Sequence, residues 1–150
     1  MSSDLDKALE EIQRALYEGY SDTVIDHAQS PRNLGRIDEP DGFASVLGDC
    51  GDTMQVWLKV KDNAIKDIRY LTDGCGTSIA AGSMATEMAR GKTIAEAARI
   101  TRKDVLDALG GLPEESEHCA LLAANTIKAA VRDYLAYKNE PWKRAYRKYY

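Results

Sequence analysis

The residues most able to do chemistry in this sequence are its three cysteines. Cys50 lies in GDCGDT between two aspartates, one of them Asp52, whose carboxylates oppose formation of a thiolate. Cys75 lies in DGCGTS, and Cys119 directly follows His118. Because thiolates and imidazole nitrogens are good ligands for soft and intermediate metal ions, these residue types predict a site for metal or sulfur chemistry.

Two of the cysteines are predicted at or near the N-terminus of a helix. There, free backbone N–H groups and the positive end of the helix dipole favour a thiolate over a thiol. We therefore expect Cys75 and Cys119 to be prepared to bind metal or to attack sulfur. Gly51, Gly74 and Gly76 adjoin the cysteines and would let the backbone approach a bound ligand closely.

Two kinds of centre fit the candidate ligands. A tetrahedral zinc site could be built from the three cysteines and a histidine, although no closely spaced cysteine pair typical of structural zinc sites is present. An iron–sulfur cluster could be held by the three thiolates and a weaker fourth ligand, which would make the cluster easier to build and to lose. The candidate ligands are Cys50, Asp52, Cys75, His118 and Cys119.

The composition of the chain indicates one globular domain without a disulfide framework. Its 150 residues are 44% hydrophobic and 29% charged, which is enough to bury an ordinary core. A net charge of -4 argues against nucleic acid as the main partner. No apolar run is long enough to span a membrane, and the first residues do not resemble a signal peptide, so we expect a cytoplasmic protein with reduced thiols.

Hydrophobic periodicity predicts which elements position the cysteines. Apolar residues at helical spacing predict an amphipathic helix over 3–17 and a shorter helix over 21–29, followed by a loop to about residue 42. A change to period two predicts a strand from residue 43, a second strand carrying Met54 to Val60, and a return strand over 65–72. Together these strands form an antiparallel meander.

Helices should cover one face of that meander. They are predicted from residue 77 to a C-cap at Gly91, then in two short segments that each open on a threonine, and finally in a long segment from His118. The fold class is therefore α+β, a small three-stranded antiparallel sheet with helices packed mainly on one face. We expect a single domain over residues 1–150, with an N-terminal helix extension over 1–19.

The last thirteen residues, 138–150, form a basic aromatic tail with five basic side chains and one acidic one. We interpret this tail as an amphipathic helix that folds back onto the domain. Contact with an acidic surface is the alternative. The side chains expected to pack inward are Trp142, Ala145, Tyr146 and Tyr149.

Four segments, in order along the chain, resemble the signature segments of the IscU/NifU-type iron–sulfur cluster assembly scaffolds. The resemblance extends from about Tyr20 to Tyr134, and it implies the fold of that family. An ordered set of four is far more specific than any single segment. The segments are YSDTVIDHAQSPRNLG, CGDTM, DGCGTSIAAGSMATEMARGKT and LP followed by HCALLAANTIKAAVRDY.

The resemblance implies a scaffold without conventional enzymatic turnover. On it, a transient [2Fe–2S] cluster is assembled from iron and sulfur and then transferred to apo-proteins. By position, Cys50, Cys75 and Cys119 match the cluster cysteines, Asp52 matches the aspartate linked to cluster lability, and His118 matches the adjacent histidine. Cys119 also matches the acceptor of persulfide sulfur, supplied by a cysteine desulfurase; free sulfide is the alternative source.

One alternative function and one departure from the family pattern accompany this resemblance. The alternative is a zinc-containing sulfurtransferase that accepts persulfide from a cysteine desulfurase. The departure is LPEESEHC, which stands where many scaffolds carry LPPVK, so we do not expect handoff through an Hsp70-type chaperone. The choice between Asp52 and His118 as fourth ligand stays open, as does a homodimer that shares one cluster.

Four further residues have simpler interpretations. His27 is expected on a helix surface or behind the ligands rather than among them. Arg32 and Asn33 are expected in a loop that packs beside the site. Trp57 projects from the polar face of its strand, where it would contact a partner unless a helix covers it.

Overall fold

The computed structural model describes residues 3–16 and 18–146. Three strands form one antiparallel sheet in the order β1-β2-β3, which confirms the predicted meander. Their bounds are Gly42–Leu47 for β1, Thr53–Lys61 for β2 and Ala64–Thr72 for β3. The β1–β2 connection contains Cys50, and β3 leads directly to Cys75.

The helices begin close to the residues that the sequence indicates. Ser21 accepts a hydrogen bond from the N–H of Val24, and Thr93 and Thr101 each form a capping box, which fixes three helix starts. The α-helices are α1 Ser3–Leu16, α2 Asp22–Gln29, α3 Gly76–Ala89, α4 Ile94–Ala98, α5 Arg102–Leu109 and α6 Glu117–Tyr137. Two short 3-10 helices are η1 Glu114–Ser116 and η2 Pro141–Tyr146. In the described part of the chain, no helix is both long and apolar enough to cross a membrane.

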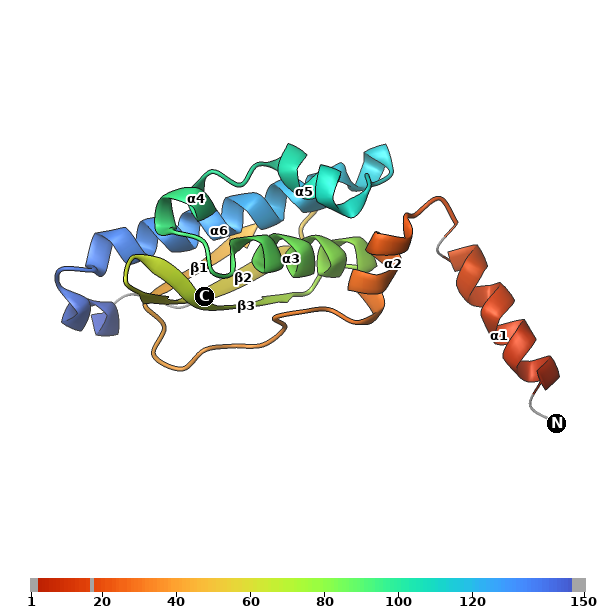
Figure 1. The fold of residues 1–150 in the computed structure, drawn as a ribbon, viewed down its shortest axis with the longest axis horizontal. Helices are drawn as coiled ribbons and strands as arrows, with labels where there is room; N and C mark the ends of the chain where they lie inside the picture. Colours follow the sequence, from red (N-terminus) through yellow and green to blue (C-terminus); the bar gives the residue numbers. More distant parts are fainter. Residues whose placement is uncertain (1–2, 17, 147–150) are drawn as a thin grey trace.

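Helices α3 to α6 lie on one face of the sheet, as expected for this fold class (Figure 1). Helix α6 packs across β1 and β2, while α3 packs along β3. The contact surfaces of both helices are rich in alanine, which lets the helix backbones approach the sheet closely. The alanines buried in the core include Ala80, Ala81, Ala85, Ala120, Ala123 and Ala130.

The segment between α2 and β1 covers part of the opposite face of the sheet (Figure 1). Trp57 is only 7% exposed there, with its ring centroid 5.2 Å from that of Phe43. The guanidinium carbon of Arg36 lies 6.0 Å from the Trp57 ring centroid. Trp57 is therefore covered by a loop and a neighbouring strand rather than by a helix, and it does not present a free surface to a partner.

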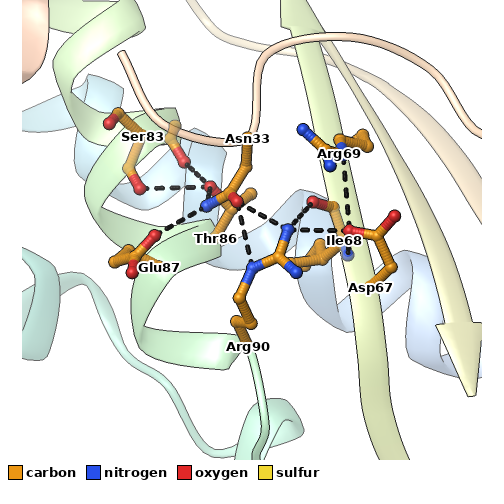
Figure 2. Close-up of polar contacts among 9 residues, drawn as sticks. Asn33, Asp67, Ile68, Arg69, Ser83, Thr86, Glu87 and Arg90 are labelled. Atoms are coloured by element: carbon orange, nitrogen blue, oxygen red, sulfur yellow. Dashed lines mark hydrogen bonds and ion pairs between the residues drawn. The ribbon is translucent and has the colours of Figure 1, made fainter. Parts of the chain in front are cut away.

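A polar network ties the same loop to the far end of α3 (Figure 2). The amide oxygen of Asn33 accepts hydrogen bonds from Arg90 at 2.6 and 3.1 Å, and its amide nitrogen donates to Thr86 at 3.1 Å and Glu87 at 3.0 Å. Arg90 also donates to Asp67 on β3 at 2.7 Å. Asn33 thus connects the loop, α3 and β3 away from the cysteines, so the expected position beside the site was wrong.

His27 is buried rather than exposed on the surface of its helix. It is 7% exposed, and its Nδ1 lies 2.7 Å from the Oγ of Ser83 on α3. The backbone N–H of Arg32 donates to the same oxygen at 2.9 Å. Burial lowers the pKa of His27 below 6.5, so the neutral imidazole is favoured in the folded protein.

The elements near the two ends of the chain differ in how they lie relative to the rest of the domain. Helix α1 forms as predicted and extends away from the other elements (Figure 1). Near the C-terminus, the chain forms the 3-10 helix η2, and Trp142 is 63% exposed. The prediction that Trp142 packs back onto the domain was therefore wrong. Tyr149 lies outside the described residues.

Substituting Gly82 should destabilise the protein although the residue lies inside a helix. A Cβ atom at this position would overlap the ring of Tyr70, which is fully buried. We expect Gly82→Ala to lower the free energy of unfolding by about 1–3 kcal/mol, measured by urea denaturation. Gly76→Ala in the same helix is the control, because the nearest atom is 4.0 Å away and the change should be neutral or stabilising. Equal effects of the two substitutions would contradict this packing.

Substituting Asn33 tests the network between the loop and α3. Asn33 has a φ of 64°, which asparagine and glycine tolerate better than alanine. Asn33→Ala should lower the free energy of unfolding by about 1–3 kcal/mol, because it removes the hydrogen bonds and strains the backbone. Asn33→Gly removes only the hydrogen bonds and should cost less. A stability for Asn33→Ala within about 0.5 kcal/mol of the wild type would show that the network is not stabilising.

Candidate functional site

The three cysteines lie at the element boundaries that the sequence predicts, but their exposure differs. Cys50 is exposed in the connection between β1 and β2. Cys75 is also exposed and is the N-cap residue of α3. Cys119 lies in the first turn of α6 and is only 1% exposed. Two thiols are therefore open to solvent, and the third is enclosed by the protein.

Two hydroxyl groups in the first turn of α3 join the buried thiol to its neighbours. The Oγ1 of Thr77 lies 3.1 Å from the Sγ of Cys75 and 3.4 Å from the Sγ of Cys119. The Oγ of Ser78 lies 3.3 Å from the Sγ of Cys119 and donates a hydrogen bond to the Oδ2 of Asp52 at 3.2 Å. A continuous polar chain thus connects Cys75, Cys119 and Asp52.

The predicted ligands do not all come together. The Nε2 of His118 lies 3.6 Å from the Sγ of Cys119, so the structure gathers four of the five residues at one end of the sheet. Within the described ranges, no hydrogen bond links Cys50 to these four, and no three Cys, His, Asp or Glu side chains are already arranged to hold a metal ion. Binding a metal at these positions therefore requires side chains or the Cys50 connection to move.

The two thiols bridged by Thr77 have opposite electrostatic environments. A hydrogen bond from the Thr77 hydroxyl, helped by the N–H groups of Thr77 and Ser78, lowers the pKa of Cys75 below 9.0. Burial raises the pKa of Cys119 above 9.0, and the nearby charges of Cys75 and Asp52 raise it further. The direction for Cys75 agrees with the expected preference for a thiolate. For Cys119 the direction is the opposite, because desolvation outweighs the hydrogen bonds that favour the thiolate.

Gly74 allows the first turn of α3 to approach Asp52. A Cβ atom at Gly74 would lie 2.6 Å from the Cβ of Ser78 and 2.9 Å from the Oδ2 of Asp52. Gly51 has a different role, because its φ of 87° forms the turn after Cys50 and no atom lies within 4 Å of a Cβ there. Close approach at Gly74 thus involves the protein itself, whereas the sequence suggested approach to a ligand.

Sequence reasoning missed the two hydroxyl residues, Thr77 and Ser78, although both are visible in DGCGTS. The available signal was a pair of small polar side chains directly after a cysteine, in the first turn of a predicted helix. Side chains at these positions point back toward the N-terminal end of the helix. That they also meet Cys119, more than 40 residues later, could not be read from the pattern.

The different thiol environments predict different reactivities in the metal-free protein. Iodoacetamide should modify Cys75 with a half-maximal pH below 9.0, because the Thr77 hydroxyl stabilises the thiolate. Thr77→Val should move that midpoint upward. Cys119 should react only after denaturation, since it is 1% exposed and its pKa is raised. Peptide mass spectrometry would assign each modification, and equal native rates for Cys75 and Cys119 would contradict the geometry.

Comparison with known proteins places this fold and site in a family. Residues 19–141 match the family described as "NifU-like N terminal domain". The chain is 54% identical over 116 residues to "Iron-sulfur cluster assembly scaffold protein IscU 1" of Archaeoglobus fulgidus, which covers 77% of this chain and 76% of that protein. It is 44% identical over 120 residues to "Iron-sulfur cluster assembly scaffold protein IscU" of Azotobacter vinelandii, covering 77% and 93% of the two chains.

A solved structure supports the same fold. The N-terminal part of a nitrogen-fixing NifU-like protein from Brucella abortus superposes with a TM-score of 0.62 at 23% identity, covering 77% of this chain and 94% of the other. The match to the family extends over most of the chain, and it includes every element that contributes to the cysteine site. The chain therefore belongs to the family of NifU-like N-terminal domains.

Proposed function

We propose that this protein is a scaffold on which an iron–sulfur cluster is assembled and from which it is transferred to apo-proteins. The observation that carries the proposal is the gathering of Cys75, Cys119, Asp52 and His118 at one end of the sheet. These side chains come from elements that are far apart in the sequence. A set with few thiolates and weaker oxygen or nitrogen donors suits a cluster that must leave again.

The relatives support this function. The proteins from Archaeoglobus fulgidus and Azotobacter vinelandii are both named as iron–sulfur cluster assembly scaffolds. Each of these matches covers 77% of this chain, and the family match over residues 19–141 includes the elements that carry the candidate ligands. The names favour the scaffold over a zinc-containing sulfurtransferase. We accordingly propose that the protein assembles and passes on its cluster without catalysing a conventional turnover reaction.

In the proposed complex, Cys50, Cys75 and Cys119 hold a [2Fe–2S] cluster as cargo, and Asp52 or His118 supplies the fourth ligand. Binding the cluster requires side chains or the Cys50 connection to move toward the other ligands. Glycines on both sides of Cys50 fit this requirement, since Gly48 and Gly51 flank the exposed turn. Asp52 is already directed toward the cysteines by its hydrogen bond from Ser78.

The proposed partners follow from the same function. Sulfur comes from a cysteine desulfurase or from free sulfide, and the recipients are apo forms of iron–sulfur proteins. If the Cys50 of each chain did not bind the cluster at its own site, two chains could instead form a homodimer that shares one cluster. Handoff through an Hsp70-type chaperone is not part of the proposal, because the segment before His118 presents the exposed acids Glu114 and Glu115.

Asp52 should control how easily the cluster leaves. After anaerobic incubation with ferrous iron and sulfide and then desalting, the wild type should show visible charge-transfer bands that fade when an apo-ferredoxin is added. Asp52→Ala removes a weak ligand or proton acceptor next to the cysteines, so its cluster should persist, with transfer slowed roughly 10-fold or more. The fading of the visible bands gives the transfer rate.

Asp49→Ala is the matched control, because Asp49 is exposed in the same connection and its substitution removes the same charge. Its transfer rate should equal that of the wild type. Equal transfer rates for the wild type and Asp52→Ala would remove Asp52 from the mechanism. A colourless wild type that retains stoichiometric zinc, with sulfur transfer that depends on the zinc, would overturn the scaffold in favour of the sulfurtransferase.

A further inference from the structure

Helix α1 carries an apolar stripe that is open to solvent. The stripe consists of Leu5, Leu9 and Ile12, which follow one another at helical spacing and lie on one side of the helix. These side chains are 64%, 49% and 56% exposed. A helix of 14 residues is only marginally stable alone in water, and it gains most of its stability when its apolar face is packed. The stripe is therefore suited to contact with another segment.

The charges of α1 are arranged around this stripe. Between Ser3 and Leu16 the sequence has four acidic and two basic residues, a net charge of -2. At about 3.6 residues per turn, Asp4 and Asp6 fall on either side of the stripe, whereas Lys7 falls on the opposite side of the helix. An apolar centre with an acidic border fits a partner that presents apolar side chains beside basic ones.

A surface of this kind lies at the far end of the α6 helix. Trp142 in η2 is 63% exposed, and Leu135 near the end of α6 is 46% exposed. Residues 138–146 have three basic residues and one acidic one, a net charge of +2. The Nζ of Lys143 lies 5.3 Å from the Trp142 ring centroid and pairs with Glu140 at 2.7 Å. An exposed indole beside basic side chains is typical of residues that anchor an interface.

We propose that the α1 stripe of one chain binds the basic end of a second copy, where the basic end is Leu135 together with residues 138–146. Each chain has one stripe and one basic end, so two antiparallel chains make the contact twice. The product is a closed dimer with two-fold symmetry, the commonest form of protein oligomer. Neither segment contains a cysteine, so the dimer requires neither a bound metal nor the scaffold function.

A second copy fits the stripe better than the basic end of the same chain does. Within one chain, α1 and η2 lie at opposite ends of the longest axis of the molecule, with α6 between them (Figure 1). The 21 residues of α6 alone span about 31 Å. In an antiparallel pair, by contrast, each α1 lies beside the basic end of the other chain.

Pairing of two α1 helices with each other is less favourable. Each helix has a net charge of -2, and acidic residues border both stripes, so like charges would face one another. Contact with the basic end instead brings a segment of net charge -2 against one of net charge +2. The charge distribution therefore selects the basic end as the partner of the stripe.

The size of the contact determines its strength. One side of a 14-residue helix offers less area than the roughly 800 Å² per partner of a standard interface. One such contact is weak by itself, and the antiparallel pair makes two. We therefore expect a reversible dimer whose population depends on protein concentration and on salt.

The mass of the metal-free full chain in solution tests this dimer. Sedimentation equilibrium should show a mass that rises from one chain toward two over about a 100-fold range of protein concentration. Raising the salt from about 20 mM to about 500 mM should shift the equilibrium toward the monomer, because it screens the charges. A mass of one chain at every concentration would overturn the proposal, and so would growth beyond two chains.

Substitutions in α1 test the stripe. Leu9→Gln removes an apolar side chain but keeps a good helix former, so it should weaken dimerisation at least about 10-fold. Leu47→Gln is the matched control, because Leu47 is 70% exposed at the end of β1 and belongs to neither segment. Its dimerisation should equal that of the wild type. Equal weakening by both substitutions would overturn a specific role of the stripe.

Substitutions at the basic end test its charge. Lys138→Glu should weaken dimerisation roughly 3- to 10-fold at low salt and much less at high salt, because it reverses a charge that faces the acidic border of α1. Lys66→Glu changes the net charge of the chain equally, but Lys66 is exposed on β3, outside both segments. It should therefore have a smaller effect. The same weakening in both variants would overturn the charge match and leave only general repulsion.

Mixing two variants shows which segments meet. The stripe variant combines Leu5→Gln, Leu9→Gln and Ile12→Gln, and the end variant combines Leu135→Gln and Trp142→Ala. Each variant alone has no intact contact and should stay monomeric. Together they restore one intact contact, so the mixture should form a heterodimer that is weaker than the wild-type dimer.

The other outcomes of this mixing experiment identify other arrangements. Wild-type dimerisation of the end variant alone would overturn the proposal in favour of pairing between two α1 helices. A mixture that stays monomeric would overturn contact between the stripe and the basic end. Urea denaturation should give the same midpoint for both variants as for monomeric wild type, which verifies that the domain is folded. Cluster formation from ferrous iron and sulfide reports on the scaffold function separately, so either proposal can fail without the other.

Discussion

The site depends on the close packing of the first turn of α3 between the N-terminal end of α6 and the start of β2. Gly74 makes this approach possible, because a side chain there would come within 2.6 Å of the Cβ of Ser78 and 2.9 Å of Asp52. With Gly74 in place, the hydroxyls of Thr77 and Ser78 reach Cys119, and Ser78 also holds Asp52. Backbone sterics at one residue thus determine which polar groups meet.

This packing also gives two chemically similar thiols different properties. Cys75 lies at the open edge of the turn, where a hydroxyl and backbone N–H groups lower its pKa. Cys119 lies beneath the turn, where burial raises its pKa and blocks access. Cys50 is exposed in the connection between β1 and β2, and it is the third thiol of the set.

The remainder of the fold keeps this end of the molecule in place. Alanine-rich faces hold α3 and α6 close to the sheet, and Tyr70 packs against Gly82 so closely that no larger residue fits in the helix. At the far end of α3, Asn33 and Arg90 join the helix to the preceding loop and to β3 (Figure 2). Because α3 is fixed along its length, the position of its first turn is well defined.

The sequence by itself determined the elements, the fold class, the family and the candidate ligands. These features depend on local periodicity, on helix-capping residues such as Thr93 and Thr101, and on ordered motifs that surround each cysteine. Only the tertiary structure decided that Cys119 is buried, that Thr77 joins it to Cys75, and that Cys50 and Cys75 are exposed. Burial and contact depend on which distant segments pack together, and the pattern along one segment does not contain that information.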